Sequence, residues 1–426
     1  MIRISKNKDM SDAEVYEGTS EIQTEKNNVE ITIRKEKYYT NRVTVKNIER
    51  RSTYYYQRYI HNKWEAAIKY QTYDDKDFKF IFVGDPQIGG SRNRYRPYPK
   101  YKTTTTDDEG NRNDAFNWNR VVEQAFSLTK EPSVFLSAGD QADDCNGIGG
   151  IDNQESEYSA FLYPKKLKQI VMATSVGNHE VFTNGFGRHF NVPNPLTNST
   201  VTRRYNGWYT GYNYFFKYNN VLVVVLETND NRESDYRITV RNAIKKYPDT
   251  DWRIGLFHHD IFGNGNTHSQ SDAKNRRGVI LNVLSKYNFD LVINGHDHVY
   301  TSSKFVSFKD QEIPSRLYYE ENYKIEEVKK NEINKDPKGT FFVTANCSSG
   351  SKFMAFYEKE NLDYVLNHKQ TNTTSFGVLD FTQKDGNAYL EIKSYDAETG
   401  NPIDDSFTIE KKAGSNVDKV FFNIYI

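Results

Sequence analysis

Phe289-Asp290-Leu291-Val292-Ile293 runs directly into Asn294-Gly295-His296-Asp297-His298, which joins an apolar segment to a polar turn. The first half is typical of a buried strand, and the second half is a glycine turn that carries two histidines. Two imidazoles at such a turn make a poor core, because both would be desolvated without an evident partner nearby in the sequence. Ligands of open α/β sheets collect at the carboxyl ends of strands, so these histidines are better explained as part of a metal site.

The size and charge of the chain restrict its class. It has 426 residues, which predicts two or three domains and a sizeable core. Lys plus Arg equals Asp plus Glu at 57 each, so a formal net charge of zero gives no electrostatic reason to expect nucleic acid as a partner. No apolar run approaches the roughly 20 residues of a membrane helix, so no transmembrane segment is expected. The oligomeric state cannot be predicted from the sequence.

The N-terminus and the cysteines bear on the cellular compartment. Residues 1–6 lack the apolar stretch of a secretory signal, so we expect either a cytoplasmic protein or one whose leader has been removed. Cys145 and Cys347 are too few for a disulfide framework or a four-cysteine zinc site. Two free buried thiols are expected, with one disulfide as the alternative.

The first seventy or so residues have a β pattern. Residues 29–33 and 42–45 alternate apolar and polar side chains, and residues 52–56 are rich in strand formers. A small β-sandwich is therefore predicted for residues 1–76, although the segment is short and a strand is expected to be missing from its N-terminal end. The polar stretch 73–77 is interpreted as a linker to a second domain at 77–426.

After this linker, short apolar runs alternate with amphipathic segments, which predicts a layered α/β domain. One helix is expected to begin at an Asp114 cap and another to cover residues 273–287. The charged tract 313–336 is interpreted as a surface excursion, after which residues 340–344 and 388–392 return to β character. The apolar runs are residues 78–83, 133–138, 170–176, 221–226, 253–257 and 290–293.

Five of these six runs end in polar residues suited to metal ions. The fourth run, which ends at Leu226-Glu227-Thr228, carries no prediction. Mixed carboxylate, amide and imidazole ligands suit zinc, manganese or iron, and this many ligands suit two ions that could clamp the oxygens of a phosphoryl transfer. The five ends are Gly84-Asp85-Pro86-Gln87, Gly139-Asp140-Gln141-Ala142-Asp143, Gly177-Asn178-His179-Glu180, His258-His259-Asp260 and the opening pair of histidines.

The order Gly-Asp-Pro-Gln, Gly-Asp-x-x-Asp, Gly-Asn-His-Glu, His-His and Gly-His-Asp-His resembles that of the calcineurin-like metallophosphoesterases. Residues 47–56 resemble the fibronectin type III-like module of the purple acid phosphatase branch, and residues 396–407 are similar to the same branch. The resemblance spans nearly the whole chain, and its motifs are more specific for the superfamily than for the substrate. It implies an α/β metallophosphoesterase fold, a layered β-sandwich flanked by helices, preceded by a small all-β fibronectin III-like domain.

The resemblance also implies two metal ions bridged by Asp140, either divalent or of mixed valence (Zn, Mn or Fe). His258 is preferred to His259 as a ligand, because the ligand should come first after the strand. By position, Asp85 and His298 would bind the first metal, whereas Asn178, His258 and His296 would bind the second.

His179 would act as the general acid that protonates the leaving alcohol, while a metal-bound hydroxide attacks phosphorus. Glu180 either orients His179 or forms a surface salt bridge. Two positions depart from the family pattern. Asp143 stands where purple acid phosphatases carry a tyrosinate, so their charge-transfer colour should be absent and the preference for ferric iron weaker. Gln87 stands where the superfamily often has histidine, and it either ligates the first metal through its carbonyl oxygen or holds a bound water.

Three residues are predicted to contact the substrate. They are Asn178, His268 on the glycine-rich loop 263–268, and Arg92, which could pair with phosphate oxygens in a bidentate manner. For His268 the alternative is an ordinary loop histidine, and for Arg92 it is a solvated side chain.

The predicted activity is hydrolysis of small-molecule phosphate esters, most of all phosphomonoesters, as in acid phosphatases. One alternative is a phosphodiesterase that acts on nucleotides or lipid head groups. An alternative from another class is a binding or adhesion protein with a non-catalytic metal site. The resemblance implies a secreted or cell-surface protein, although no signal peptide is present in the chain.

Overall fold

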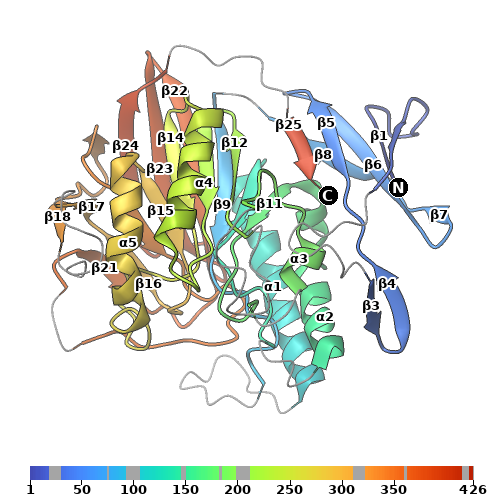
Figure 1. Ribbon diagram of the computed structural model, residues 1–426, viewed down its shortest axis with the longest axis horizontal. Helices are drawn as coiled ribbons and strands as arrows, with labels where there is room; N and C mark the ends of the chain where they lie inside the picture. Colours follow the sequence, from blue (N-terminus) through green and yellow to red (C-terminus); the bar gives the residue numbers. More distant parts are fainter. Residues whose placement is uncertain are drawn as a thin grey trace.

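The computed structural model describes residues 1–18, 30–73, 76–92, 106–144, 150–181, 185–197, 212–309, 322–358, 362–414 and 422–425. Its main body consists of two seven-stranded sheets with helices on their outer faces (Figure 1). Side chains from both sheets, such as Phe80 and Val223, belong to one hydrophobic core. The architecture is therefore the helix-flanked β-sandwich that the sequence predicts.

The six apolar runs form strands of these sheets, three in each. The first sheet has the order β11 (Val171–Thr174), β10 (Val134–Ser137), β9 (Phe78–Val83), β22 (Ser375–Lys384), β23 (Asn387–Asp396), β24 (Phe407–Lys412) and β19 (Ile333–Lys335). The second has the order β12 (Tyr214–Tyr218), β13 (Val221–Val225), β14 (Trp252–Leu256), β15 (Leu291–Asn294), β20 (Phe341–Thr344), β16 (Tyr300–Ser303) and β21 (Val365–Lys369). β9 to β11 run parallel to one another, as do β13 to β15, so their carboxyl ends lie at shared edges.

Strand β13 shows why these runs are apolar without alternation. Val223 and Val225 belong to the core between the sheets, whereas Leu222 and Val224 belong to a second core. That second core also contains residues of α4 (Glu233–Lys246) and α5 (Asp272–Lys286). A strand that is buried on both faces needs apolar side chains at every position.

Helices α1 (Asp107–Thr129) and α2 (Gly150–Phe161) lie on the other side of the molecule from α4 and α5 (Figure 1). The prediction that the first helix begins at Asp114 was wrong, because Thr106 caps α1 by accepting a hydrogen bond from the Glu109 amide. Gly110 and several asparagines in the first two turns weaken the helical signal. Asp114 is instead buried, and its carboxylate accepts the amides of Gly89 and Ser91 at 3.0 and 3.1 Å.

The N-terminal part is all β, as predicted. Its main sheet contains β1 (Ile2–Ser5), β2 (Glu14–Tyr16), β6 (Thr53–Ile60), β7 (Lys63–Trp64) and β8 (Ile68–Gln71), and β3 (Glu30–Ile33) forms a hairpin with β4 (Glu36–Tyr39). One strand of this part comes from the other end of the chain. β25 (Phe422–Tyr425) pairs with β5 (Thr44–Ile48), and the two lie beside each other in Figure 1. The domain boundary at residues 76 and 77 stays a prediction.

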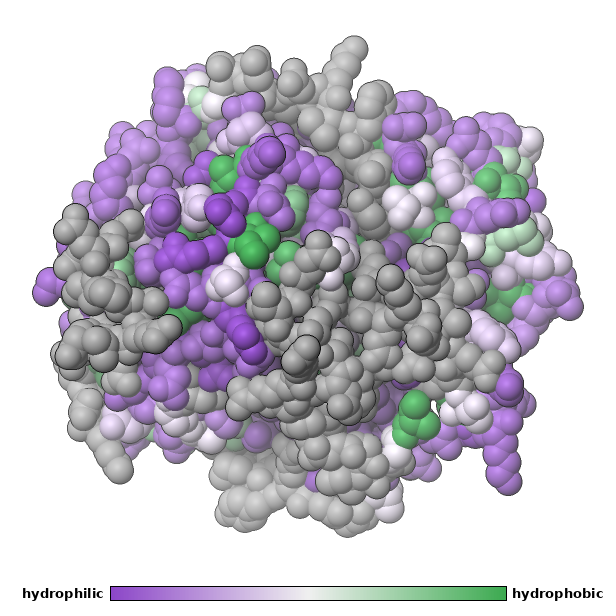
Figure 2. Space-filling view, in the orientation of Figure 1, coloured by the Kyte–Doolittle hydropathy of each residue, from purple (hydrophilic) through white to green (hydrophobic). Residues whose placement is uncertain are grey.

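The described part of the charged tract is mostly exposed, as predicted, but its two strands pair with other strands of the fold. β18 (Tyr323–Glu326) pairs with β17 (Phe305–Phe308), and β19 lies parallel to β24 at the sheet edge. Cys347 is a buried free thiol, whereas Cys145 and residues 313–321 lie outside the described residues. In the described part of the chain, no helix is long and apolar enough to cross a membrane. On the face shown in Figure 2, hydrophobic side chains form small separate groups among hydrophilic ones.

Candidate metal centre

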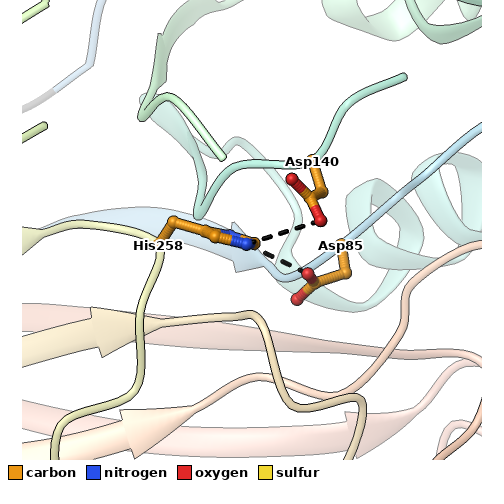
Figure 3. A group of neighbouring side chains, drawn as sticks. All are labelled: Asp85, Asp140 and His258. Carbon is orange, nitrogen blue, oxygen red and sulfur yellow. Dashed lines mark ion pairs between the residues drawn. The ribbon is translucent and has the colours of Figure 1, made fainter. Parts of the chain in front are cut away.

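Three side chains from different strand ends meet in the interior between the sheets. Asp85 follows β9, Asp140 follows β10 and His258 follows β14, and one ligand atom from each lies within 4.8 Å of the other two. His258 Nε2 is 3.4 Å from an Asp140 carboxylate oxygen, and Nδ1 is 3.8 Å from an Asp85 oxygen (Figure 3). All three residues are buried, so the charges in this cluster are little screened by water.

Glycines allow the loops that carry these groups to approach one another. A Cβ atom at Gly177 would collide with the carboxylate of Asp140, and one at Gly295 would collide with that of Asp85. Only a residue without a side chain fits at either position. The Gly-Asn-His-Glu and Gly-His-Asp-His motifs therefore need their glycines for packing against the two aspartates.

Two more predicted ligands surround Nε2 of His258. The side-chain oxygen of Asn178 lies 2.9 Å from it, and Nδ1 of His296 lies 3.0 Å from it. Nitrogen and oxygen ligands at 2.0–2.2 Å from one metal ion are separated from each other by about 3.0–3.5 Å. Asn178, His296 and Asp140 each come within 2.9–3.4 Å of Nε2 of His258, a separation that two ligands of one ion can have.

His298 lies on the Asp85 side of the cluster, with Nε2 3.6 Å from an Asp85 oxygen. Its Nδ1 donates to the backbone carbonyl of Lys352 at 2.7 Å, and Nδ1 of His258 donates to that of Ala138 at 2.8 Å. Such bonds fix the tautomer in which the other ring nitrogen is free to bind a metal. The distances group His296 with His258 and His298 with Asp85, the division that the sequence predicts; the ligand roles themselves stay predictions.

The ionisation of the cluster reflects its burial. Burial raises the pKa of Asp85 to about 8, and the neighbouring Asp140 adds to this effect. Burial also acts to raise the pKa of Asp140, but the charges of His258 and His179 hold it below its usual range. Burial acts to lower the pKa of His258, yet the Asp140 carboxylate raises it to about 9. Protons thus occupy the cluster at neutral pH, and a bound metal ion would displace them.

Gln87 is the remaining predicted ligand of the first metal. Its side-chain nitrogen donates to the Asp143 carboxylate at 2.7 Å and lies 3.0 Å from Nε2 of His179. Its side-chain oxygen is buried and has no hydrogen-bond partner among the residues that the structure describes. A buried carbonyl without a partner costs about 1–3 kcal/mol, which a metal ion or a bound water would offset. The chemistry of these donors suits a second metal ion, and both predicted roles of Gln87 stay predictions.

His179 lies beside the cluster with one ring nitrogen turned toward it. Its Nδ1 donates to the backbone carbonyl of Asp143 at 2.5 Å, and its amide donates to Asp140 at 3.1 Å. Nε2 then lies 3.8 Å from the other Asp140 oxygen. The His179 side chain is 13% exposed, so it is partly open to solvent at the edge of the buried cluster.

Neither predicted role of Glu180 matches its position. The side chain is fully buried, and its two carboxylate oxygens accept backbone amides of Asp140, Gln141, Ala142 and Gly177 at 2.6–3.2 Å. Glu180 therefore joins the loop after β10 to the loop after β11. A glutamate in a polar turn is usually exposed, so the sequence held no signal for this role.

The two remaining histidines of this region lie against His296. The rings of His268 and His259 have their centroids 4.0 and 4.4 Å from that of His296. His268 is half-buried, whereas His259 is buried and its Nδ1 lies 2.8 Å from the Thr228 hydroxyl. Burial lowers the pKa of His259 well below its usual value. No role was predicted for Thr228, which follows β13. It thus positions His259, the neighbour of the preferred ligand His258.

Asp297, between the two histidines of the opening motif, positions the loop that carries His268. Its carboxylate accepts the amides of His268 and Ser269 at 3.2 and 2.7 Å. The position of Asp297 between two predicted ligands in the sequence was the observation from which this role could have been predicted. Arg92 instead forms an ion pair with Asp107 in the first turn of α1, and its described contacts lie there.

The arrangement of aspartate, asparagine and histidine at five strand ends of a helix-flanked β-sandwich is that of a metallophosphoesterase. The chain belongs to the calcineurin-like phosphoesterase family, whose match covers residues 78–300 and thus more than half of it. This range contains every predicted metal ligand. Phosphoester hydrolysis with metal ions is accordingly the chemistry of its class.

Among solved structures, the chain is similar to a purple acid phosphatase isolated from yellow lupin (Lupinus luteus) seeds. The TM-score is 0.53 at 13% identity, and the alignment covers 96% of this chain and 69% of that one. At this identity the likeness shows the fold alone. Similarity to Vps29 of Chaetomium thermophilum, with a TM-score of 0.29 and 10% identity over 78% of this chain and 98% of that one, is too weak to carry an argument. No curated protein sequence matches the chain.

Proposed function

We propose that this chain is a dinuclear metal-dependent phosphomonoesterase with an N-terminal fibronectin III-like domain at residues 1–76 and a catalytic domain at 77–426. The observation that carries the proposal is the convergence of Asp140, Asn178 and His296 to within 2.9–3.4 Å of Nε2 of His258. The neighbouring Asp85 and His298, 3.6 Å apart, supply a second set of donors.

In this proposal, Asp140 lies between two metal sites. Asp85, His298 and the orphaned oxygen of Gln87 or a water on it would hold the first ion, and Asn178, His258 and His296 would hold the second. Such a pair of ions, when bound, supplies a nucleophile near neutral pH and neutralises charge on the phosphoryl group. The donor set suits zinc, manganese or iron. Asp143 stands where purple acid phosphatases carry a tyrosinate, and its carboxylate accepts a hydrogen bond from Gln87. No charge-transfer colour is therefore expected.

His179 protonates the leaving alcohol. The bond from Nδ1 to the Asp143 carbonyl holds the ring, so Nε2 can carry the proton that is delivered. Asn178 also contacts the phosphoryl group, and His268 contributes from the half-exposed loop against His296. The preference for monoesters is supported by the resemblance of the motif order and of residues 47–56 to the purple acid phosphatase branch.

Elemental analysis combined with two assays tests this function. The chain is loaded with zinc, manganese or iron and assayed on p-nitrophenyl phosphate and bis-p-nitrophenyl phosphate. Two equivalents of metal and faster turnover of the monoester are expected. Asp140→Ala and His296→Ala should each abolish metal binding and hydrolysis together, whereas His368→Ala, at an exposed position on β21, should alter neither. Full activity in both cluster variants refutes the proposal, and two bound metals without turnover on any ester would favour a binding protein.

A further inference from the structure

A cavity of about 330 Å³ lies at the junction of the N-terminal strands with the main body. Its walls come from β1, β6 and β8 on one side and from the edge strands β11 and β12 of the two large sheets on the other. The segment 189–194 closes a further side. None of the predicted metal ligands is part of its wall. The volume falls in the range typical of small-molecule sites.

The wall is largely apolar and aromatic. Tyr56, Tyr70, Phe190, Tyr214 and Phe216 contribute rings, and Val171 and Met172 contribute aliphatic surface from β11. Edge strands are usually covered to prevent pairing with other chains, and the N-terminal strands cover this edge without filling the space beside it. A ligand with an apolar body would bury its surface here.

Among the described residues that line the wall, every fully charged side chain is basic and none is a carboxylate. Arg58 is paired with Glu65 at 2.7 Å, and His189 contacts Glu155 at 2.8 Å. Lys217 donates to the backbone carbonyl of Asp249 at 3.4 Å, which is a neutral acceptor. Lys168 is half-buried as a residue, and within the described residues its ammonium group forms no ion pair or hydrogen bond. A cation at an apolar cavity favours an anion, because partial desolvation strengthens the attraction.

We propose that this cavity binds a small amphipathic anion, with its apolar body against the aromatic wall and its carboxylate, sulfonate or phosphate at Lys168. Lys168 is well placed, because the Tyr56 hydroxyl donates to its backbone carbonyl at 2.6 Å and so joins η1 (Lys165–Gln169) to the aromatic wall. The site does not depend on the proposed hydrolysis. Loss of either activity leaves the other measurable.

The test uses the full-length, metal-loaded protein with the fluorescent anion 1-anilinonaphthalene-8-sulfonate as the probe. One saturable site is expected, from which octanoate displaces the probe better than octanol and much better than octylammonium. Lys168→Gln should weaken the binding of octanoate about tenfold and leave the binding of octanol unchanged, because the substitution removes only a charge-assisted contact. Val171→Trp, at a half-buried wall position, should fill the cavity and abolish binding of all three compounds.

Lys165→Gln is the matched control, because Lys165 is exposed on the same short helix and outside the cavity wall. It should bind octanoate as the unmodified chain does. Equal displacement by octanoate and octylammonium overturns the proposal. An octanoate affinity that Lys168→Gln leaves unchanged, or no saturable binding at all, overturns it as well.

Discussion

The side-chain nitrogen of Gln87 lies 3.0 Å from Nε2 of His179 and so links a predicted metal ligand to the predicted general acid. Its other contact, at 2.7 Å, is the Asp143 carboxylate. Both positions that depart from the family pattern are therefore in contact with each other and with His179. Asp143 holds Gln87 by its side chain and His179 by its backbone carbonyl.

Gln87→Leu is expected to weaken metal binding at the first site about 10- to 100-fold, because it removes the orphaned buried oxygen that is proposed to bind the ion or a water on it. The second site should retain its metal. Stepwise titration of metal-free protein against a chromophoric chelator measures the two affinities. Gln124→Leu on the outer part of α1 serves as the control. If the first site binds metal equally well in Gln87→Leu and in the unmodified chain, Gln87 has neither proposed role.

His179→Ala is expected to retain both metals and to lose activity in a way that depends on the leaving group. Turnover of phenyl phosphate, whose phenolate needs a proton, should fall about 10²- to 10⁴-fold. Turnover of 2,4-dinitrophenyl phosphate should fall far less, because its leaving group departs without one. Steady-state kinetics on the two esters gives the comparison. An equal loss on both would assign His179 to binding rather than to proton transfer.

Glu180→Ala is expected to destabilise the fold and to reduce affinity at both metal sites. Four backbone amides of the β10 and β11 loops would lose their acceptor, at a cost of about 3 kcal/mol or more. Urea unfolding and metal titration measure the two effects. Glu123→Ala, on an exposed position of α1, should change neither. Unchanged metal affinity would show that the loops keep their positions without Glu180.

The strands that build the site could be predicted because they are buried on both faces, which forces runs of apolar residues in a chain otherwise rich in charge. The residues that follow them could be proposed as one site because parallel strands bring their carboxyl ends to a shared edge. The grouping of His296 with His258 was implied by the resemblance to the calcineurin-like metallophosphoesterases, which assigns each ligand by its place in the motif order.

Contacts between distant segments could not be predicted in this way. The pairing of β25 with β5 joins the two ends of the chain, and the local pattern of residues 422–425 contains nothing that specifies its partner. Glu180 acts through backbone amides of another loop, and Thr228 acts through the buried imidazole of His259. The start of α1 was missed because its first turns are stabilised by the Thr106 cap and by the contacts of Asp114, not by helix propensity.

Glu227, at the end of β13, is expected to make stability depend on pH independently of the metal centre. Burial raises its pKa from 4.5 to about 7. The pKa of Glu227 is higher in the folded state than in the unfolded state. The contribution of Glu227 to stability is therefore fully present below about pH 4.5 and is lost as pH rises through 7. Between pH 6 and pH 8 this loss amounts to about 1.4 kcal/mol.

Glu227→Gln should remove that part of the pH dependence, because the amide oxygen can still accept the Asn229 amide, a bond of 2.5 Å in this structure. The free energy of unfolding in urea, measured at pH 6 and pH 8 with the metals kept saturating, gives the difference. Glu332→Gln, at an exposed position, should leave the pH dependence as it is. If Glu227→Gln and the unmodified chain lose the same stability between the two pH values, Glu227 is already ionised at pH 6 and a partner must compensate for its burial.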